Sequence, residues 1–190
     1  MLCALNEKLE HSGSGMLLKL KRTPGIFLVG FMGCGKSTVG EALAEEIGWT
    51  FLDLDSEIER TEGTSIAEIF ETRGEAEFRR VEAAALARCV RSVQLGRPQV
   101  VSLGGGAFLS QENFNLVTHN GVTIWLDCPY DMIEKRVAAA SHRPLARDPE
   151  RLRELFDARR KGYARAEYRI DAASDDASAA VTQILGLSLL

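Results

Sequence analysis

The chain has 190 residues, of which 45% are hydrophobic and 26% charged, and its formal net charge is −4 at pH 7. This length suits one well-buried domain rather than two. The mild acidity argues against a basic nucleic-acid-binding face, and no apolar run approaches the roughly 18–20 residues of a membrane span, so we expect neither nucleic acid nor membrane as a partner.

Strand and helix patterns alternate along most of the chain. Residues 1–24 are expected to form a flexible N-terminal extension, because charges interrupt them and HSGSG has the composition of a linker. Apolar runs then predict strands at 25–30, 49–55, 99–104, 121–127 and 168–171. Helical patterns cover 37–47, 56–93 with breaks near TEGTS and TRGE, the residues after 110, 131–140, the residues from 149, and 177–187. This order indicates a three-layer α/β/α fold with a central, mostly five-stranded parallel sheet.

A glycine-rich loop follows the first predicted strand. Residues 30–38, GFMGCGKST, fit the pattern G-x-x-x-x-G-K-[ST] at every fixed position, with a strand before it and a helix after it. In such a phosphate-binding loop (P-loop), backbone N–H groups surround the phosphates, the lysine contacts the β and γ phosphates, and the hydroxyl ligates Mg²⁺. The pattern predicts a P-loop NTPase fold that binds nucleotide through Gly33, Cys34, Gly35, Lys36, Ser37 and Thr38. We interpret Cys34 as a small loop residue; a thiol with a lowered pKa is the alternative.

Two further features fall at the carboxyl ends of predicted strands, where ligands bind in parallel sheets. In FLDLD, Asp53 and Asp55 are two residues apart, so on an extended chain both point to the same side. One is expected near the metal and one on an acceptor hydroxyl; two solvated or helix-capping carboxylates are the alternative. In VVSLGGGAFLS, three consecutive glycines follow a strand, so we expect one site that includes them. Asp127, after another strand, is expected in a turn or cap.

Four arginines are candidates for binding an anion. Arg79 lies beside the apolar side of a helix, where a surface ion pair with Glu82 is the alternative. Arg159 interrupts an apolar helical stripe, so its guanidinium needs an anion, either a structural carboxylate or one from a substrate. Arg143 and Arg147 lie in the polar segment SHRPLARDPE. This segment is either a solvated loop or one that closes over nucleotide and brings an arginine to the transferring phosphoryl group.

Six motifs occur in a fixed order along the chain: GFMGCGKST, DLD, GEAEFRRVE, SLGGGA, RPLA and ARRKGY. With this order the chain resembles the shikimate kinase family over about residues 25–190. The resemblance implies a single kinase domain with a lid at about 139–150, which phosphorylates the 3-hydroxyl of shikimate with ATP and Mg²⁺. The alternatives are another P-loop small-molecule kinase, such as gluconate kinase, and a non-catalytic nucleotide-binding module. We expect a monomer, and the scattered cysteines favour reduced thiols in the cytoplasm.

The resemblance also implies roles for individual residues. It places Lys36 on the phosphates, Asp53 with Ser37 at Mg²⁺, and Asp55 on the shikimate hydroxyls, with Asp53 or Asp55 taking the proton. It assigns the binding of the shikimate carboxylate to Arg79 and Arg159, and it implies that Gly104, Gly105 and Gly106 line the shikimate pocket. Arg136 lies near the adenine, and Arg143 in the lid contacts ATP and takes part in catalysis. The family usually has a proline and an apolar residue where this chain has Lys161 and Gly162; this leaves Arg160 open as the alternative to Arg159, which the helical stripe favours.

Overall fold

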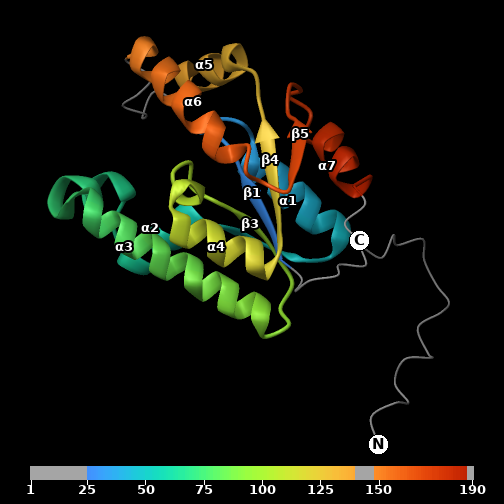
Figure 1. Ribbon diagram of the computed structural model, residues 1–190, viewed down its shortest axis with the longest axis horizontal. Helices are drawn as coiled ribbons and strands as arrows, with labels where there is room; N and C mark the ends of the chain where they lie inside the picture. The colour runs from blue at the N-terminus through green and yellow to red at the C-terminus, as the bar shows by residue number, and fades with distance from the viewer. Residues whose placement is uncertain (1–24, 140–147, 188–190) are drawn as a thin grey trace, which may run out of the picture.

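The computed structural model describes residues 25–139 and 148–187, in which strands and helices alternate (Figure 1). The strands are β1 (Gly25–Val29), β2 (Thr50–Asp53), β3 (Gln99–Ser102), β4 (Val122–Asp127) and β5 (Tyr168–Asp171). The helices are α1 (Lys36–Ile47), α2 (Leu54–Glu62), α3 (Ile66–Gln94), the short 3₁₀ helix η1 (Ala107–Leu109), α4 (Gln111–Asn120), α5 (Tyr130–Ala139), α6 (Pro149–Tyr163) and α7 (Ala177–Leu185). Most of the predicted lid, including Arg143, lies outside the described residues.

The five strands form one sheet in the order β2-β3-β1-β4-β5, and every neighbouring pair is parallel. Helices α1 and α7 pack together on one face, and α3 and α4 pack together on the other (Figure 1). The predicted three-layer α/β/α fold with a five-stranded parallel sheet is therefore confirmed. None of the helices within the described part of the chain is long and apolar enough to cross a membrane.

The central strand β1 has the uninterrupted apolar sequence of a strand covered on both faces. Its residues Ile26, Phe27 and Leu28 have no exposed surface. From β1 the chain passes to β2, at one edge of the sheet. From β3 it later passes to β4, which lies on the opposite side of β1 from β2 and β3. The loops after β1 and β3 thus lie beside this change of direction, which is where ligands bind in open α/β sheets.

Two helix boundaries position the chain next to these loops. Strand β2 ends at Asp53, whose carboxylate accepts a hydrogen bond from the Ser56 N–H at 3.1 Å and caps α2. Asp55 therefore lies in the first turn of a helix, and the predicted strand over 49–55 was too long. Gly74, with φ 82°, breaks α3 where TRGE predicted a break, and the half that follows carries Arg79.

Candidate active site

The P-loop surrounds the N-terminus of α1. Gly33 and Gly35 have φ values of 77° and 92°, which residues with a Cβ rarely adopt, so the loop can curl tightly before the helix begins at Lys36. The Lys36 ammonium donates to the carbonyls of Gly30 at 3.0 Å and Phe31 at 3.1 Å, which holds it over the loop. Cys34 is 2% exposed and belongs to the core, and its role as a small loop residue stays a prediction.

Ser37 and Asp53 bring two hard oxygen ligands together at the start of α1 and the end of β2. The Ser37 hydroxyl donates to Oδ2 of Asp53 at 2.6 Å. Among the described residues no cluster of three or more His, Cys, Asp or Glu side chains could hold a metal ion. A hydroxyl and one carboxylate beside a phosphate loop do fit Mg²⁺, which usually keeps several waters and takes phosphate oxygens as its other ligands.

Asp55 is a half-buried carboxylate that lies between the P-loop and the three consecutive glycines, Gly104–Gly106. Burial raises its pKa above the ordinary value, the Lys36 ammonium opposes this shift, and the neighbouring Asp53 carboxylate adds to it. A carboxylate whose ionised form is disfavoured in this way accepts a proton more readily than a solvated one. The sequence argument placed both aspartates on one side of an extended strand. The structure instead uses Asp53 as the helix cap and Asp55 as the residue that faces the second loop.

The glycine loop, Gly104–Gly106, brings three charged side chains together. A Cβ added to Gly104 would collide with Oδ1 of Asp55. At Gly105 it would lie 3.2 Å from Nη1 of Arg159, and at Gly106 it would lie 2.7 Å from Nη1 of Arg79. One carboxylate and two guanidinium groups, which come from α2, α6 and α3, therefore lie against three consecutive glycines that leave no room for side chains.

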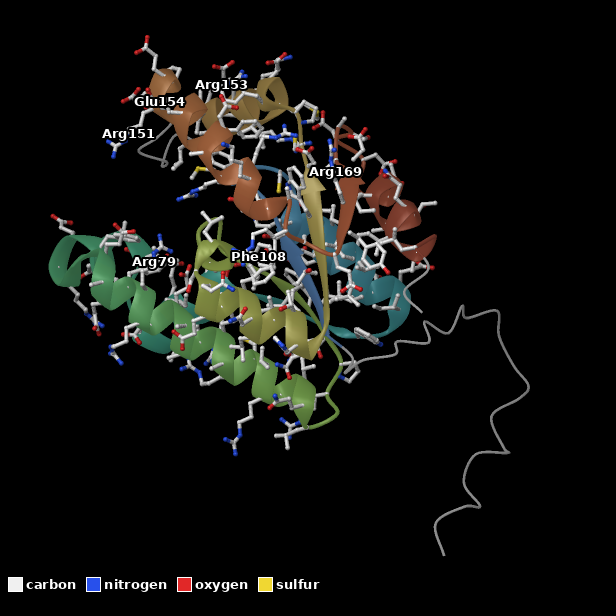
Figure 2. All side chains as sticks on the ribbon, viewed as in Figure 1. Arg79, Phe108, Arg151, Arg153, Glu154 and Arg169 are labelled. Carbon is white, nitrogen blue, oxygen red and sulfur yellow. The ribbon has the colours of Figure 1, made fainter. Side chains whose placement is uncertain are left out.

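Arg79 forms the predicted pair with Glu82, but the pair is not a surface one. Its Nη1 donates to Oε2 of Glu82 at 2.9 Å, and Glu82 is 1% exposed. Burial raises the pKa of Glu82, and the Arg79 guanidinium opposes that shift. In Figure 2 the Arg79 side chain lies on the side of α3 that faces α6. The buried glutamate thus holds the guanidinium against Gly106 with part of it accessible.

Arg159 and Arg160 have different partners. The Arg160 guanidinium donates to Oδ2 of Asp127 at 2.7 Å, at the carboxyl end of β4. Arg169, which is labelled in Figure 2, pairs with the same oxygen at 2.6 Å. Asp127 is thus a buried ion-pair acceptor and not the turn or cap residue that the sequence predicted. No carboxylate in the described part of the chain pairs with Arg159, whose guanidinium carbon lies 5.8 Å from the centre of the Phe31 ring. Of these two arginines, Arg159 is therefore the one without a carboxylate partner among the described residues.

Helix α6 approaches the glycine loop closely because of Gly162. A Cβ at Gly162 would collide with Cδ2 of Leu109 in η1. The next residue, Tyr163, is 1% exposed and donates from its hydroxyl to the carbonyl of Gly105 at 2.5 Å. The unusual Lys-Gly sequence before this tyrosine therefore gives α6 a direct contact with the residues after the triple glycine.

One cavity of about 430 Å³ joins the P-loop to the second glycine loop. Residues 32–39, Asp53, Asp55 and Gly105 line it. Arg136 lines it as well, and donates to the carbonyl of Gly33 at 3.0 Å and to Asp175 at 2.7 Å. From the cluster at the second glycine loop, Asp55 and Gly105 line this cavity, whereas Arg79 and Arg159 are not among its lining residues.

Comparisons with known proteins agree with this geometry. The family model described as shikimate kinase matches residues 32–187. The chain belongs to the shikimate kinase family. A shikimate kinase from Persephonella marina is 43% identical to it over 162 residues, which cover 85% of this chain and 96% of that protein.

Solved structures of the family have the same fold. A shikimate kinase from Acinetobacter baumannii in complex with shikimate matches with a TM-score of 0.79 at 36% identity, over 88% of this chain and 92% of that one. A gluconokinase from Sinorhizobium meliloti has a TM-score of 0.54 at 21% identity, over 87% of this chain and 91% of that one. The second match shows the shared fold only.

Sequence reasoning missed the segment from the end of β5 to α7, which lines the same cavity as the P-loop. Its lining residues are Asp171, Ala172, Ser174, Asp175 and Asp176. This segment has no glycine run or lysine that would mark it as a site. One signal was present, because it follows a parallel strand whose carboxyl end lies at the same sheet edge as the P-loop.

Proposed function

We propose that the chain transfers the γ-phosphoryl group of ATP to the 3-hydroxyl of shikimate. The observation that carries the proposal is the glycine loop, against which Asp55, Arg79 and Arg159 lie, and whose Gly105 lines the P-loop cavity together with Asp55. Shikimate has one carboxylate and three hydroxyl groups on a small ring, and these charges complement it. The shikimate bound in the relative from Acinetobacter baumannii supports the same substrate.

On the acceptor side, we assign the shikimate carboxylate to Arg79 and Arg159. Guanidinium groups bind carboxylates with two parallel hydrogen bonds, and two arginines from different helices would fix the orientation of the ring. Asp55 accepts a hydrogen bond from the attacking hydroxyl and takes its proton as the new bond to phosphorus forms, with Asp53 as the alternative acceptor. The raised pKa of Asp55 favours this role.

On the nucleotide side, Lys36 and the N–H groups of the P-loop hold the phosphates in line with the acceptor hydroxyl. Ser37 and Asp53 would hold Mg²⁺, which neutralises phosphate charge when bound. We assign Arg136, which bonds to Gly33 and Asp175, to the adenine end of the bound nucleotide. A role for Arg143 in the lid remains a prediction, because this residue lies outside the described part of the chain.

We further propose that residues 25–190 act as a single kinase domain, as a monomer in the cytoplasm. The continuous sheet and the absence of close cysteine pairs in the sequence support this organisation. Analytical ultracentrifugation of the full chain tests the oligomeric state.

A coupled assay of ADP release tests the function, with shikimate, with gluconate and without an acceptor. We expect ADP release that depends on shikimate, with the phosphate found on the 3-hydroxyl. Release with gluconate would instead assign the chain to the other kinase class, and release without any acceptor, or none at all, would contradict phosphoryl transfer to a small acid.

Gly105→Ala should raise the KM for shikimate by roughly tenfold and leave the KM for ATP within about twofold. The added methyl group displaces the Arg159 guanidinium, which would lie only 3.2 Å away. Steady-state kinetics with each substrate varied in turn measures both values. Gly186→Ala is the matched control, because a Cβ there meets only ordinary contacts at 3.5 Å. An equal rise in both KM values would show that the substitution disturbs the whole cavity.

A further inference from the structure

The backbone of the glycine loop forms a tight turn that is closed by its own hydrogen bonds. The carbonyl of Gly104 accepts a hydrogen bond from the Ala107 N–H at 3.1 Å. The carbonyl of Gly106 accepts one from the Leu109 N–H, also at 3.1 Å. These two bonds lead the loop into η1 and turn two of its carbonyl oxygens toward its own backbone.

Two side chains donate hydrogen bonds to the other two carbonyl oxygens of residues 104–107. The hydroxyl of Tyr163 donates to the carbonyl of Gly105, and Nδ2 of Asn113 donates to the carbonyl of Ala107 at 3.1 Å. All four consecutive carbonyl oxygens from 104 to 107 thus have a donor within the protein. Neither side chain belongs to the loop, since Tyr163 ends α6 and Asn113 lies in the first turn of α4.

The N–H groups of the same loop are not paired in this way. Within residues 25–139 and 148–187, no acceptor takes a hydrogen bond from the N–H of Gly104, Gly105 or Gly106. A segment whose carbonyls are occupied and whose N–H groups are unpaired presents donors only, as in the anion-binding turns of other proteins. Such a surface attracts the oxygen atoms of an acid, whereas one carbonyl turned outward would repel them.

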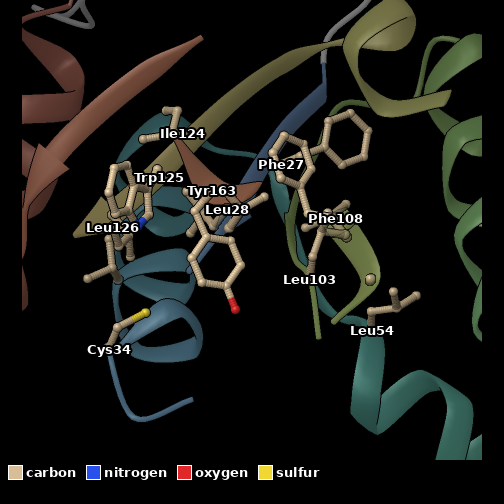
Figure 3. Packing of buried hydrophobic residues seen from close by; sticks show 14 of the residues in the cluster. Phe27, Leu28, Cys34, Leu54, Leu103, Phe108, Ile124, Trp125, Leu126 and Tyr163 are labelled. Carbon is tan, nitrogen blue, oxygen red and sulfur yellow. The ribbon is translucent and has the colours of Figure 1, made fainter. Parts of the chain in front are cut away.

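The side chains of Tyr163 and Asn113, which donate to the loop, are both buried. Tyr163 is 1% exposed; in Figure 3 its ring lies among Leu28 and Trp125, and its hydroxyl points away from them. Burial raises the pKa of Tyr163, so its hydroxyl keeps the proton that it donates. Asn113 is 2% exposed, and its Oδ1 has no partner in the described part of the chain. Burying the Asn113 amide with its Oδ1 unpaired costs folding free energy, and the hydrogen bond from Nδ2 to the loop is the contact that the side chain makes in return.

We propose that Tyr163 and Asn113 are positioning residues, which hold the carbonyls of the glycine loop away from the acceptor so that the loop offers it only N–H donors. This inference rests on the proposed function, because the acceptor it serves is shikimate. Neither residue touches the reacting atoms. Tyr163 bonds to Gly105, and Arg159, one turn before it on α6, has its guanidinium 3.2 Å from where a Cβ of Gly105 would stand, so the two residues reach the loop from the same helix.

Tyr163→Phe tests the inference, because it removes the hydroxyl and keeps the buried ring. We expect the KM for shikimate to rise roughly tenfold, the loss that one buried hydrogen bond predicts, with the KM for ATP and kcat within about threefold. Within residues 104–109, the amides of Ala107 and Leu109, which donate to the loop carbonyls, should exchange about tenfold faster in the ligand-free variant than in the ligand-free wild type. Exchange in β1 and α1 should stay unchanged.

Thr123→Val is the matched control. Thr123 is fully buried in β4 and its hydroxyl accepts the Glu167 N–H at 3.0 Å, so the substitution also removes one buried hydroxyl that bonds to the backbone. Thr123→Val should lower the thermal unfolding temperature about as much as Tyr163→Phe does, but it should leave both KM values and the exchange of residues 104–109 unchanged. A general loss of stability would therefore affect both variants alike, whereas a positioning role affects only Tyr163→Phe.

Asn113→Leu provides an independent second test. It removes the unpartnered Oδ1, which favours folding, but it also leaves the buried carbonyl of Ala107 without a donor, so we expect a folded protein of somewhat lower stability. We expect faster exchange at residues 104–109 and a rise of about fivefold in the KM for shikimate. Unchanged exchange and an unchanged shikimate KM in both variants would overturn the proposal.

The two proposals fail in different ways. If the wild-type protein phosphorylates shikimate and the variants bind it normally, the positioning roles are wrong and the function stands. If the wild-type protein shows no shikimate-dependent ADP release, the proposed function is wrong. Exchange at residues 104–109 in the ligand-free variants then decides alone whether Tyr163 and Asn113 hold the loop.

Discussion

Asp55→Asn should lower kcat by roughly 10²–10⁴-fold and leave the protein folded. The amide keeps the size of the carboxylate but cannot take the proton of the acceptor hydroxyl. Steady-state kinetics with shikimate measures the loss. Asp157→Asn is the control, because Asp157 is an exposed aspartate that pairs with Arg153 on the outside of α6, and its kcat should be normal. A near-normal kcat for Asp55→Asn would remove Asp55 from the mechanism.

The raised pKa of Asp55 adds a second expectation for this substitution. Between the ordinary pKa of an aspartate and the raised value, the folded protein binds more protons at this site than the unfolded chain does. The contribution of Asp55 to stability therefore falls as the pH rises through that interval, and the ionised carboxylate opposes folding above it. Asp55→Asn should unfold at the same temperature as the wild type, or a higher one, at pH 7.5. A clearly lower unfolding temperature would show that the ionised carboxylate stabilises the fold.

The same pKa shift sets the acid limb of the activity profile. We expect kcat/KM for the wild type to fall on the acid side at a pH above the ordinary aspartate range, because the base must be ionised. Measuring kcat/KM for shikimate between pH 4 and 8 tests this, with saturating nucleotide. A profile that is flat to the lower end of this range would mean that no group with a raised pKa acts as the base.

Arg159→Ala should raise the KM for shikimate by about 30–150-fold, while the KM for ATP changes by less than about threefold. A charge-assisted pair of hydrogen bonds is worth about 2–3 kcal/mol, which corresponds to this factor. The guanidinium has no carboxylate partner in the described part of the chain, so its removal breaks no ion pair there. Equal losses for both substrates would show that Arg159 is structural.

Arg160→Ala is the matched control for this experiment. It shortens the neighbouring arginine of the same helix, but that arginine pairs with the buried Asp127. We expect a lower free energy of unfolding in denaturant titrations, because a buried carboxylate loses one of its two cations. The KM for shikimate should stay within about twofold. A large rise in this KM would reverse the assignment of the two arginines.

Most of the fold could be predicted from the sequence, because strands buried on both faces leave uninterrupted apolar runs. The run at β1 predicted its strand within one residue, and the glycine-containing sequence TRGE predicted the break at Gly74. The boundary after β2 could not be predicted in this way. The apolar pattern extends through Leu54, but the Asp53 side chain begins a helix by capping it, and this local hydrogen bond ends the strand.

The candidate site was predictable where the chemistry itself needs a rare pattern. The P-loop and the triple glycine are such patterns, and the structure brings them into one cavity. The partners of charged groups were not predictable, because they lie far apart along the chain. Asp127 pairs with arginines 33 and 42 residues later, and nothing in its local sequence distinguishes such a pair from a cap.

Gly162 also constrains how this sequence can diverge. Because Cδ2 of Leu109 fills the space in which a Cβ at 162 would stand, a side chain gained at 162 forces the Leu109 side chain to move. A lineage that gains an apolar residue at 162 is therefore expected to change residue 109 as well, and Leu109→Ala is a substitution that makes room for it. Descendants of this chain should therefore show large residues at one of the two positions but not at both, whatever selection acts on their catalysis.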